Sequence, residues 1–153
     1  MDRKRRPKVL LAKTSLDGHN RGIKVISRWL MEAGMEVVFL GQYQTEEMVT
    51  KAAKEEDVDV IGLSFLGGEH LYSTEIMQEK MKKEGLREDI LFIVGGVIPK
   101  EDIEKLYAIG VDKVFLPGTS MQEIVEYIQN SAWALHADRN AKEKRTVGNE
   151  RII

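Results

Sequence analysis

The chain has 153 residues, of which 42% are apolar and 31% are charged, and its formal net charge is −2 with histidine neutral. These values predict one globular domain with a sizeable core, and the near balance of charge argues against binding to nucleic acid or an anionic membrane through a strong global field. The absence of cysteine excludes a disulfide framework, a thiolate metal site and a cysteine nucleophile, and it agrees with a cytoplasmic protein.

The first residues, MDRKRRPKVLLAK, place a basic cluster before an apolar run of only four residues, Val9 to Ala12. A signal peptide needs about 7–15 apolar residues and a membrane helix about 20, so neither is predicted. We interpret residues 1–7 as a solvated basic leader, and a weak contact of Arg3–Arg6 with a nucleic acid or a partner is the less favoured alternative.

Five short apolar runs rich in β-branched residues predict strands, and segments with helical periodicity separate them. The predicted strands are Val9–Ala12, Val37–Leu40, Val58–Ser64, Ile90–Val94 and Lys113–Leu116. The first predicted helix has one apolar face and stops at Gly34; that face consists of Ile23, Ile26, Leu30 and Ala33. The next three predicted helices span Thr45–Glu56, Ser73–Glu84 and Pro99–Gly110. The fifth predicted helix follows the capping box Ser120–Glu123.

The alternation of strand and helix, repeated five times, predicts parallel strands with right-handed crossovers and helices on both faces. The runs Val58–Leu63 and Leu91–Val94 show no polar alternation, which is typical of strands buried on both sides. The predicted fold class is α/β: a flavodoxin-like (Rossmann-like), doubly wound, five-stranded parallel sheet of order 2-1-3-4-5. We expect this domain to cover residues 8–135, with residues 136–153 as a polar, loose C-terminal tail.

In doubly wound sheets, ligands bind outside the carboxyl ends of the strands, so the residues just after each strand are candidates for a site. Several of them are glycines, which let a flat or bulky ligand approach the backbone closely. The loops that would share this edge are Lys13–Gly22, Ser64–Gly68, Gly95–Gly96 and Pro117–Ser120.

Familiar ligand motifs of related folds are missing from these loops. No GxGxxG follows the first strand and no GxxxxGK[ST] occurs, which argues against a dinucleotide site and a Walker nucleotide site. A phosphoacceptor receiver should carry an aspartate at the end of the third strand, where this chain has Ser64. Around the same serine, the run from Gly62 to Leu66 lacks the second glycine of a hydrolase nucleophile elbow.

Asp17 and His19 stand two positions apart in the loop after the first strand. Imidazole is the commonest protein metal ligand, and a carboxylate bonded to its second nitrogen fixes the tautomer and raises the basicity of the ring. One histidine is too few for a zinc site, but it suits a metal whose other positions a macrocycle already fills. The residues alone leave a second interpretation open, in which Asp17 caps the helix and His19 is a surface loop residue.

Three motifs at these strand ends resemble, in order, those of cobalamin-binding domains. Asp17-Gly18-His19-Asn20-Arg21-Gly22 matches DxHxxG, Ser64-Phe65-Leu66 matches SxL, and Gly95-Gly96 matches GG. Over roughly residues 7–130 the chain resembles the small subunit or C-terminal B12-binding domain of methylmalonyl-CoA mutase-type enzymes, including 2-hydroxyisobutyryl-CoA mutase. Membership of this family implies base-off binding, in which the motif histidine is the lower axial ligand of cobalt and the dimethylbenzimidazole tail is buried in the domain.

The resemblance implies a role for each matching residue. His19 would be the cobalt ligand, Asp17 its hydrogen-bonded partner, and Lys13 a lysine that extends this chain of contacts. Ser64 would hydrogen-bond the base of the tail. The other implied cofactor-binding residues would line the corrin, the tail and its channel: Gly18, Gly22, Leu66, Gly95, Gly96 and Thr119.

Four further residues need comment. Asn20 stands where the family usually has aspartate, which leaves the ligand motif intact, and Phe65 is bulkier than usual and either reshapes the tail channel or faces the core. His136 is expected on the surface near the end of the last helix. His70 is expected to be an exposed loop residue, with a contact to a partner or the corrin edge as the alternative.

The resemblance implies the adenosylcobalamin-binding subunit of an acyl-CoA mutase, an isomerase that uses radical chemistry. The family's reaction needs a substrate-binding TIM barrel of about 250 residues, so we expect a large barrel subunit as the partner that binds the acyl-CoA substrate. No catalytic residue is expected on this chain, which should be inactive alone. The alternative is a corrinoid carrier protein of a methyltransferase system, although an N-terminal helical bundle is usual there and few residues precede the first strand here.

Overall fold

The structure is a computed structural model that describes residues 6–14 and 18–152. The side chains of residues 139, 140 and 142–152 are outside this description. Most of the predicted basic leader and the predicted site residue Asp17 therefore lie outside the described residues.

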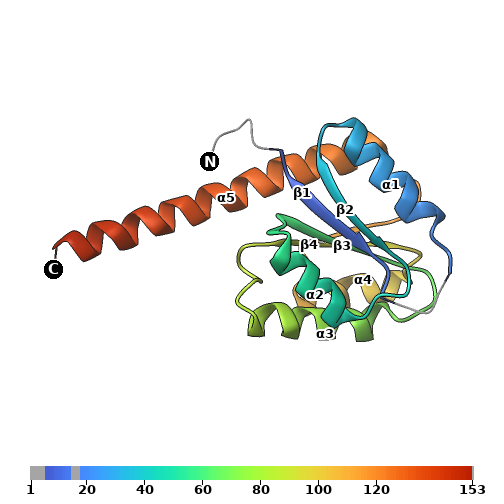
Figure 1. The fold of residues 1–153 in the computed structure, drawn as a ribbon. Coiled ribbons are helices and arrows are strands. Elements are labelled where there is room, and N and C mark those ends of the chain that lie inside the picture. Colours follow the sequence, from blue (N-terminus) through green and yellow to red (C-terminus); the bar gives the residue numbers. More distant parts are fainter. Residues whose placement is uncertain (1–5, 15–17, 153) are drawn as a thin grey trace.

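Five parallel strands form one sheet in the order β2-β1-β3-β4-β5 (Figure 1), which confirms the predicted fold class. Ala12 pairs with Leu63 and Gly95 pairs with both Ser64 and Phe115, so the carboxyl ends of four strands lie along one edge of the sheet. Progression along the sheet reverses between β1 and β3, where such folds bind ligands. The strands are β1 Lys8–Ala12, β2 Glu36–Gly41, β3 Val60–Phe65, β4 Leu91–Gly96 and β5 Lys113–Phe115.

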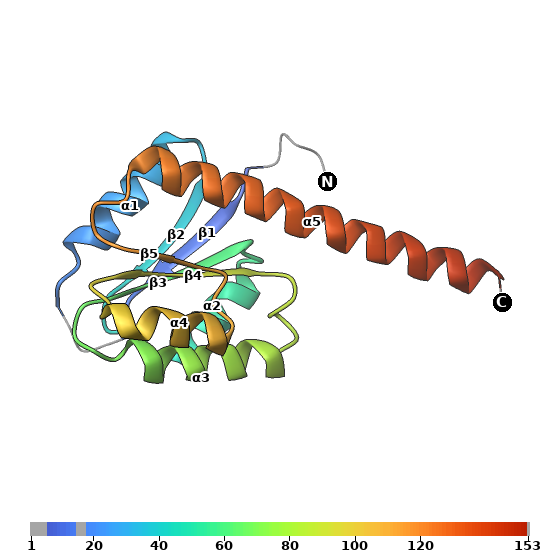
Figure 2. The ribbon, with the colours of Figure 1, turned by 180° about the vertical axis from the view of Figure 1, so that it is seen from behind.

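Helices cover both faces of the sheet, as the alternation of elements predicted. On one face lie α1 (Arg21–Glu32) and α5 (Met121–Ile152), side by side (Figures 1 and 2). On the other face lie α2 (Glu46–Glu55), α3 (His70–Lys83) and α4 (Lys100–Ile109).

Each face of the sheet has its own apolar layer. Leu10 and Phe92 pack towards α2, α3 and α4, where they meet residues such as Met77. The next residue of β1, Leu11, points to the opposite layer and packs with Leu30 of α1. Because successive side chains of a strand point to opposite faces, strands covered on both sides are apolar throughout, and this explains the uninterrupted apolar runs.

Several predicted helix ends coincide with local hydrogen bonds. The Met48 amide donates to Thr45 Oγ1 at 3.1 Å at the start of α2, and the Glu123 amide donates to Ser120 Oγ at 3.1 Å at the start of α5. These bonds satisfy amides that lack a partner within the helix. Gly110 ends α4 with φ at 125°, a conformation that is open to glycine and rare for other residues.

Two helices differ from the prediction in extent. α3 begins at His70, three residues before the predicted Ser73, and its first turn is held by a side-chain bond that is described below. α5 continues to Ile152, through the segment predicted to be a loose tail, and projects away from the body of the domain (Figure 1). Residues 137–152 are rich in helix-forming alanine, lysine, glutamate and arginine, so a helix already nucleated against the sheet propagates through them.

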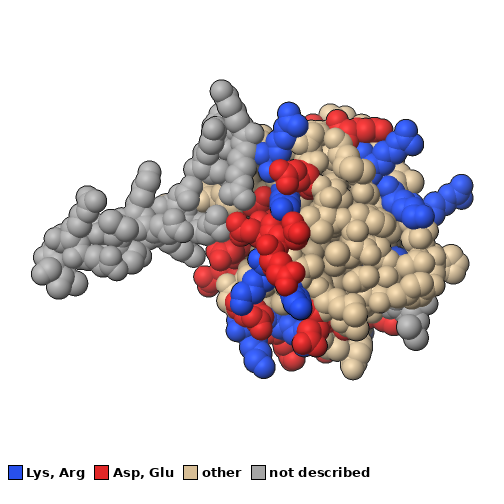
Figure 3. Space-filling view, in the orientation of Figure 1, with Lys and Arg blue, Asp and Glu red and all other residues tan. Residues whose placement is uncertain are grey.

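Acidic and basic side chains are interspersed on the face seen in Figure 3, where they form a band beside a broad area of other residues. Exposed apolar side chains on β2, its following loop and α2 include Phe39, Tyr43 and Met48. Within the described part of the chain, no helix combines the length and the apolar character needed to span a bilayer.

Candidate cofactor-binding site

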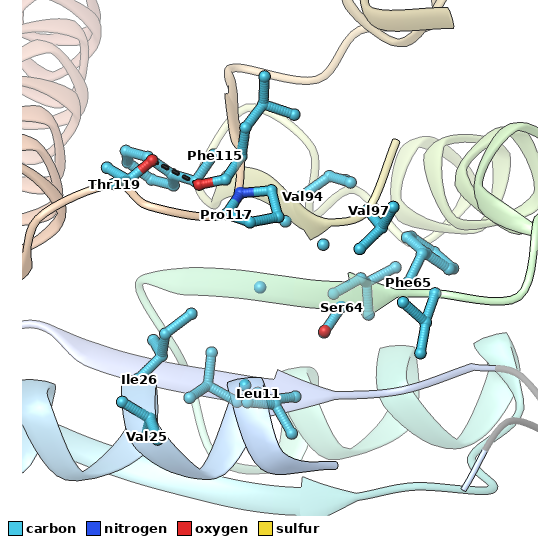
Figure 4. A pocket seen from close by; sticks show the side chains of 18 of the residues that line it. Leu11, Val25, Ile26, Ser64, Phe65, Val94, Val97, Phe115, Pro117 and Thr119 are labelled. Atoms are coloured by element: carbon cyan, nitrogen blue, oxygen red, sulfur yellow. Dashed lines mark hydrogen bonds between the residues drawn. The ribbon is translucent and has the colours of Figure 1, made fainter. Parts of the chain in front are cut away.

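A pocket of about 550 Å³ lies at the carboxyl ends of the strands, on the face of the sheet that α1 and α5 cover. In Figure 4, Leu11, Val25 and Ile26 lie on one side of it, Phe115 and Pro117 on the other, and Ser64 between them. The polar side chains among the lining residues are those of Lys13, His19, Arg21, Ser64 and Thr119. The remaining lining residues are apolar or glycine, so the pocket suits a mainly apolar group that carries a few polar atoms.

Eight of the ten residues predicted to bind a cofactor line this single pocket: Lys13, His19, Gly22, Ser64, Leu66, Gly95, Gly96 and Thr119. Gly18 is next to the lining residue His19 and is not itself part of the lining. Asp17 lies outside the described residues. Loops that are far apart in sequence thus meet where the order of the sheet predicted.

Lys13 joins the ends of three strands. Its side chain is 1% exposed, and Nζ donates a hydrogen bond to the carbonyl oxygen of Ser64 at 3.2 Å. Its backbone amide donates to the carbonyl of Gly41 at 2.8 Å, and its own carbonyl accepts from the Gln44 amide at 3.0 Å. Burying an ammonium group costs free energy unless hydrogen bonds or opposite charges compensate it. Because these bonds reach residues of β2 and β3 and the loop after β2, Lys13 fixes the relative positions of these segments.

His19 is exposed at the pocket, two residues before α1 begins at Arg21. The residue at the N-cap position of α1 is Asn20, whose side chain makes no capping bond. The alternative in which Asp17 caps the helix concerns a residue outside the described part of the chain, and it stays open. A Cβ atom added to the neighbouring Gly18 would lie 2.9 Å from the hydroxyl oxygen of Tyr43, so this loop passes close to the loop after β2.

The two glycines after β4 have a steric explanation. Gly96 has φ at 122°, and a Cβ atom at this position would lie 1.9 Å from the carbonyl oxygen of Phe65. That carbonyl accepts a hydrogen bond from the Val97 amide at 3.1 Å. A Cβ on Gly95 would lie 3.4 Å from the carbonyl oxygen of Phe115. The β3 and β4 loops can therefore approach each other this closely only because Gly96 has no side chain.

Thr119 lies in the loop between β5 and α5. Its Oγ1 donates to the carbonyl oxygen of Leu116 at 2.6 Å, as Figure 4 shows, and its amide donates to the same carbonyl at 3.2 Å. The turn is completed by Gly118, with φ at 90°. Thr119 is thus held as a half-buried part of the pocket wall.

Residue-by-residue sequence reasoning missed part of the lining. Trp29 lies on the inward side of α1 one turn after Ile26, and the apolar periodicity of that helix could have indicated it. Arg21 lies directly before Gly22 within the first motif. Val97 follows the glycine pair and Phe115 stands two residues before Pro117. No sequence motif marks either residue as part of a site.

Two histidines predicted to be exposed are buried, which corrects the sequence analysis. His70 is 4% exposed and His136 is 6% exposed. His70 Nε2 lies 2.7 Å from Asp102 Oδ2, and His136 Nε2 contacts Asp59 Oδ1. Each imidazole is buried because a carboxylate from another element meets it, and such pairing across the fold has no local sequence pattern. Among the described residues, no group of three or more His, Cys, Asp or Glu side chains could hold a metal ion.

Comparisons with known proteins agree with this geometry. Residues 7–126 match the family model described as a B12 binding domain. The chain is 41% identical over 132 residues to the pivalyl-CoA mutase small subunit of Xanthobacter autotrophicus, covering 86% of this chain and 88% of that protein. It is 42% identical over 123 residues to the 2-hydroxyisobutanoyl-CoA mutase small subunit of Aquincola tertiaricarbonis, covering 80% and 90%. A crystal structure of a cobalamin-binding protein from Desulfitobacterium hafniense superposes with a TM-score of 0.70 at 30% identity, covering 82% of this chain and 59% of that one.

Proposed function

Since this chain belongs to the family of B12-binding domains, we propose that it is the adenosylcobalamin-binding small subunit of an acyl-CoA mutase. Two of its relatives, each covered over most of its own length, are small subunits of such mutases, which are isomerases. Their names refer to pivalyl-CoA and 2-hydroxyisobutanoyl-CoA. We therefore expect the substrate of the assembled enzyme among branched acyl-CoA esters.

The pocket has the properties that the nucleotide tail of cobalamin requires. Its volume of about 550 Å³ lies within the range of about 300–1,000 Å³ that is usual for ligand sites. A dimethylbenzimidazole base is flat and mainly apolar, so it matches walls made of residues such as Leu11, Ile26 and Phe115. Ser64 supports the proposal further, because it brings a hydroxyl group to an otherwise apolar wall.

We assign the axial position on cobalt to His19. Its imidazole is exposed and lines the pocket, so it would be available to hold the metal of a bound corrin. One imidazole is enough for a cobalt ion that the four corrin nitrogens already hold. Asp17 would accept a hydrogen bond from the second ring nitrogen, which fixes the tautomer and strengthens the ligand.

The other predicted residues would bind the cofactor by shape and hydrogen bonding. Lys13 would orient the loop between β1 and α1 through its contact with the β3 loop. Ser64 would bond the tail base, and Thr119 would close the far wall. The backbone at four glycines and the side chain of one leucine would line the corrin and the channel: Gly18, Gly22, Gly95, Gly96 and Leu66.

When bound, adenosylcobalamin supplies the radical chemistry of the rearrangement. A larger TIM-barrel subunit would bind the acyl-CoA ester and shield the reacting groups from water. Exposed apolar side chains at the carboxyl edge, including Leu66, Tyr72 and Val97, offer a surface for that subunit. We expect contacts at Leu66–Tyr72 and Ile98–Glu101, and we place the complex in the cytoplasm.

The observation that carries this proposal is the convergence of three motif loops on one pocket with an exposed histidine beside it. The test is to mix the purified chain with adenosylcobalamin and a panel of acyl-CoA esters, first alone and then with a large mutase subunit. We expect binding of the cofactor by the chain alone and turnover only in the mixture. Steady isomerisation without the partner would contradict the division of labour, and methyl transfer to a thiol without any mutase partner would favour a corrinoid carrier.

A further inference from the structure

A buried side-chain pair joins α3 to α4 beside the pocket loops. His70 is the first residue of α3, and Asp102 lies in the first turn of α4. The two side chains are 5% and 15% exposed, with His70 Nε2 2.7 Å from Asp102 Oδ2. The ring of Phe65 meets the imidazole edge-on, with the ring centroids 6.5 Å apart.

The pair closes a ring of contacts around the two loops at the pocket mouth. At the strand ends, the Val97 amide donates to the Phe65 carbonyl at 3.1 Å, and Gly96 packs against the same carbonyl. At the helix starts, His70 holds Asp102. Between these two ties lie Leu66 and Val97, both lining the pocket and both substantially exposed, at 40% and 55%.

The pair is not built for stability alone. Burying an ion pair or a polar pair contributes little net stability unless every polar atom is satisfied. Within the described part of the chain, His70 Nδ1 and Thr74 Oγ1, one turn further along α3, are buried without a hydrogen-bond partner. The hydrogen bond from His70 nevertheless lowers the pKa of Asp102 below its ordinary value, against the opposite effect of burial, so the carboxylate form is favoured.

We propose that His70 and Asp102 form a positioning pair for the nucleotide tail of cobalamin: they hold the loops that carry Leu66 and Val97 at the separation that admits the tail. This inference rests on the proposed cobalamin-binding function. Neither residue lines the pocket, so the pair acts through the loops. Without it, the two loops lose their tie at the helix starts, and their ordering becomes a cost of binding.

The test compares cobalamin with cobinamide, which has the same corrin ring but lacks the nucleotide tail. We expect His70→Ala and Asp102→Ala to raise the Kd for cobalamin by about 10-fold, the scale of losing order in two or so side chains at a binding site. The Kd for cobinamide should stay within about 2-fold of the wild-type value, because cobinamide does not use the channel. Asp102→Asn keeps an acceptor for the imidazole and should lose less than Asp102→Ala, so it also serves if the alanine variants fold poorly.

His136→Ala is the matched control. It breaks a second buried histidine–aspartate pair among the described residues, which joins α5 to Asp59 next to the amino end of β3, away from the pocket. This variant should lose stability in urea unfolding and leave the ratio of the two Kd values unchanged.

Equal weakening of cobalamin and cobinamide in the His70 and Asp102 variants would overturn the proposal in favour of a purely structural pair, and so would an unchanged Kd for cobalamin. If the wild-type chain bound neither corrinoid, the proposed function itself would fail, and the inference with it.

Discussion

Gly96 is the residue on which the contact between the β3 and β4 loops depends. An added Cβ would lie 1.9 Å from the backbone oxygen of Phe65, and backbone cannot move aside as a flexible side chain can. Gly85 also has a positive φ, of 71°, but nothing lies within 4 Å of an added Cβ. The two glycines therefore separate the effect of a clash from the effect of backbone conformation.

We predict that Gly96→Ala lowers the free energy of unfolding by about 3 kcal/mol or more, whereas Gly85→Ala costs about 1–2 kcal/mol from its left-handed backbone alone. Urea denaturation followed by circular dichroism measures both values. Equal losses in the two variants would show that the close approach of the two loops is not a constraint.

Asp17 is predicted to act on the cofactor only through His19. Asp17→Asn should leave the fold intact and weaken cobalamin binding by about 10–100-fold, the usual scale for losing the carboxylate behind a metal-bound histidine. The Kd is measured by absorbance titration, with Asp57→Asn, an exposed aspartate in the turn after α2, as the control. An Asp17→Asn variant with wild-type affinity would remove this residue from the site.

At the scale of elements, the long helix α5 has a packed half and a projecting half. Its buried residues within the described side chains are Ile124, Ile128, Ala132 and His136, and the helix leaves the domain after them. The apolar layer against α1 therefore depends on the first half of the helix.

We predict that removing residues 139–153 changes the free energy of unfolding by less than about 0.5 kcal/mol and leaves the cobalamin affinity unaltered. Removal from residue 131 onward deletes the buried Ala132 and His136 and should cost about 2–4 kcal/mol. Thermal or urea unfolding of the two truncated chains measures these costs. If the chain that lacks only residues 139–153 lost cobalamin binding, the projecting half of the helix would belong to the site.

The sequence predicted all five strands and the existence of all five helices, because periodicity and capping are local signals. The start of α3 and the length of α5 were wrong for different reasons. α3 begins at His70, where the bond to Asp102 of the neighbouring helix α4 holds its first turn. α5 outlasts its apolar pattern because propagation of a helix needs no packed face.

At the scale of the whole molecule, the parallel sheet assembled the site from loops that are more than 50 residues apart in the chain, such as those of Lys13, Ser64 and Thr119. We could predict that these loops meet because the strands are parallel, and every parallel strand ends at the same edge of the sheet. What lies around the pocket could not be predicted in this way. The burial of His70 and His136 depends on Asp102 and Asp59, and pairing between distant elements leaves no spacing to recognise.

Within the described part of the chain, the pocket at the carboxyl edge lies next to the apolar layer that packs against α1 and α5. The exposed apolar side chains near the pocket mouth then have a ready explanation as the surface for a larger subunit, as proposed above. On this view the small subunit supplies cofactor position and axial ligation, and the partner supplies substrate specificity.

The central claim, that this chain carries cobalamin with His19 as the axial ligand, is tested most directly by electron paramagnetic resonance of bound cob(II)alamin. The chain is prepared with histidine labelled with nitrogen-15, and His19→Ala is the control for the two other histidines. We predict that the axial nitrogen splitting changes from a triplet in the unlabelled protein to a doublet in the labelled protein, and that His19→Ala loses the doublet. A triplet that persists in the labelled protein would show that the cofactor's own base still binds cobalt, which contradicts the account.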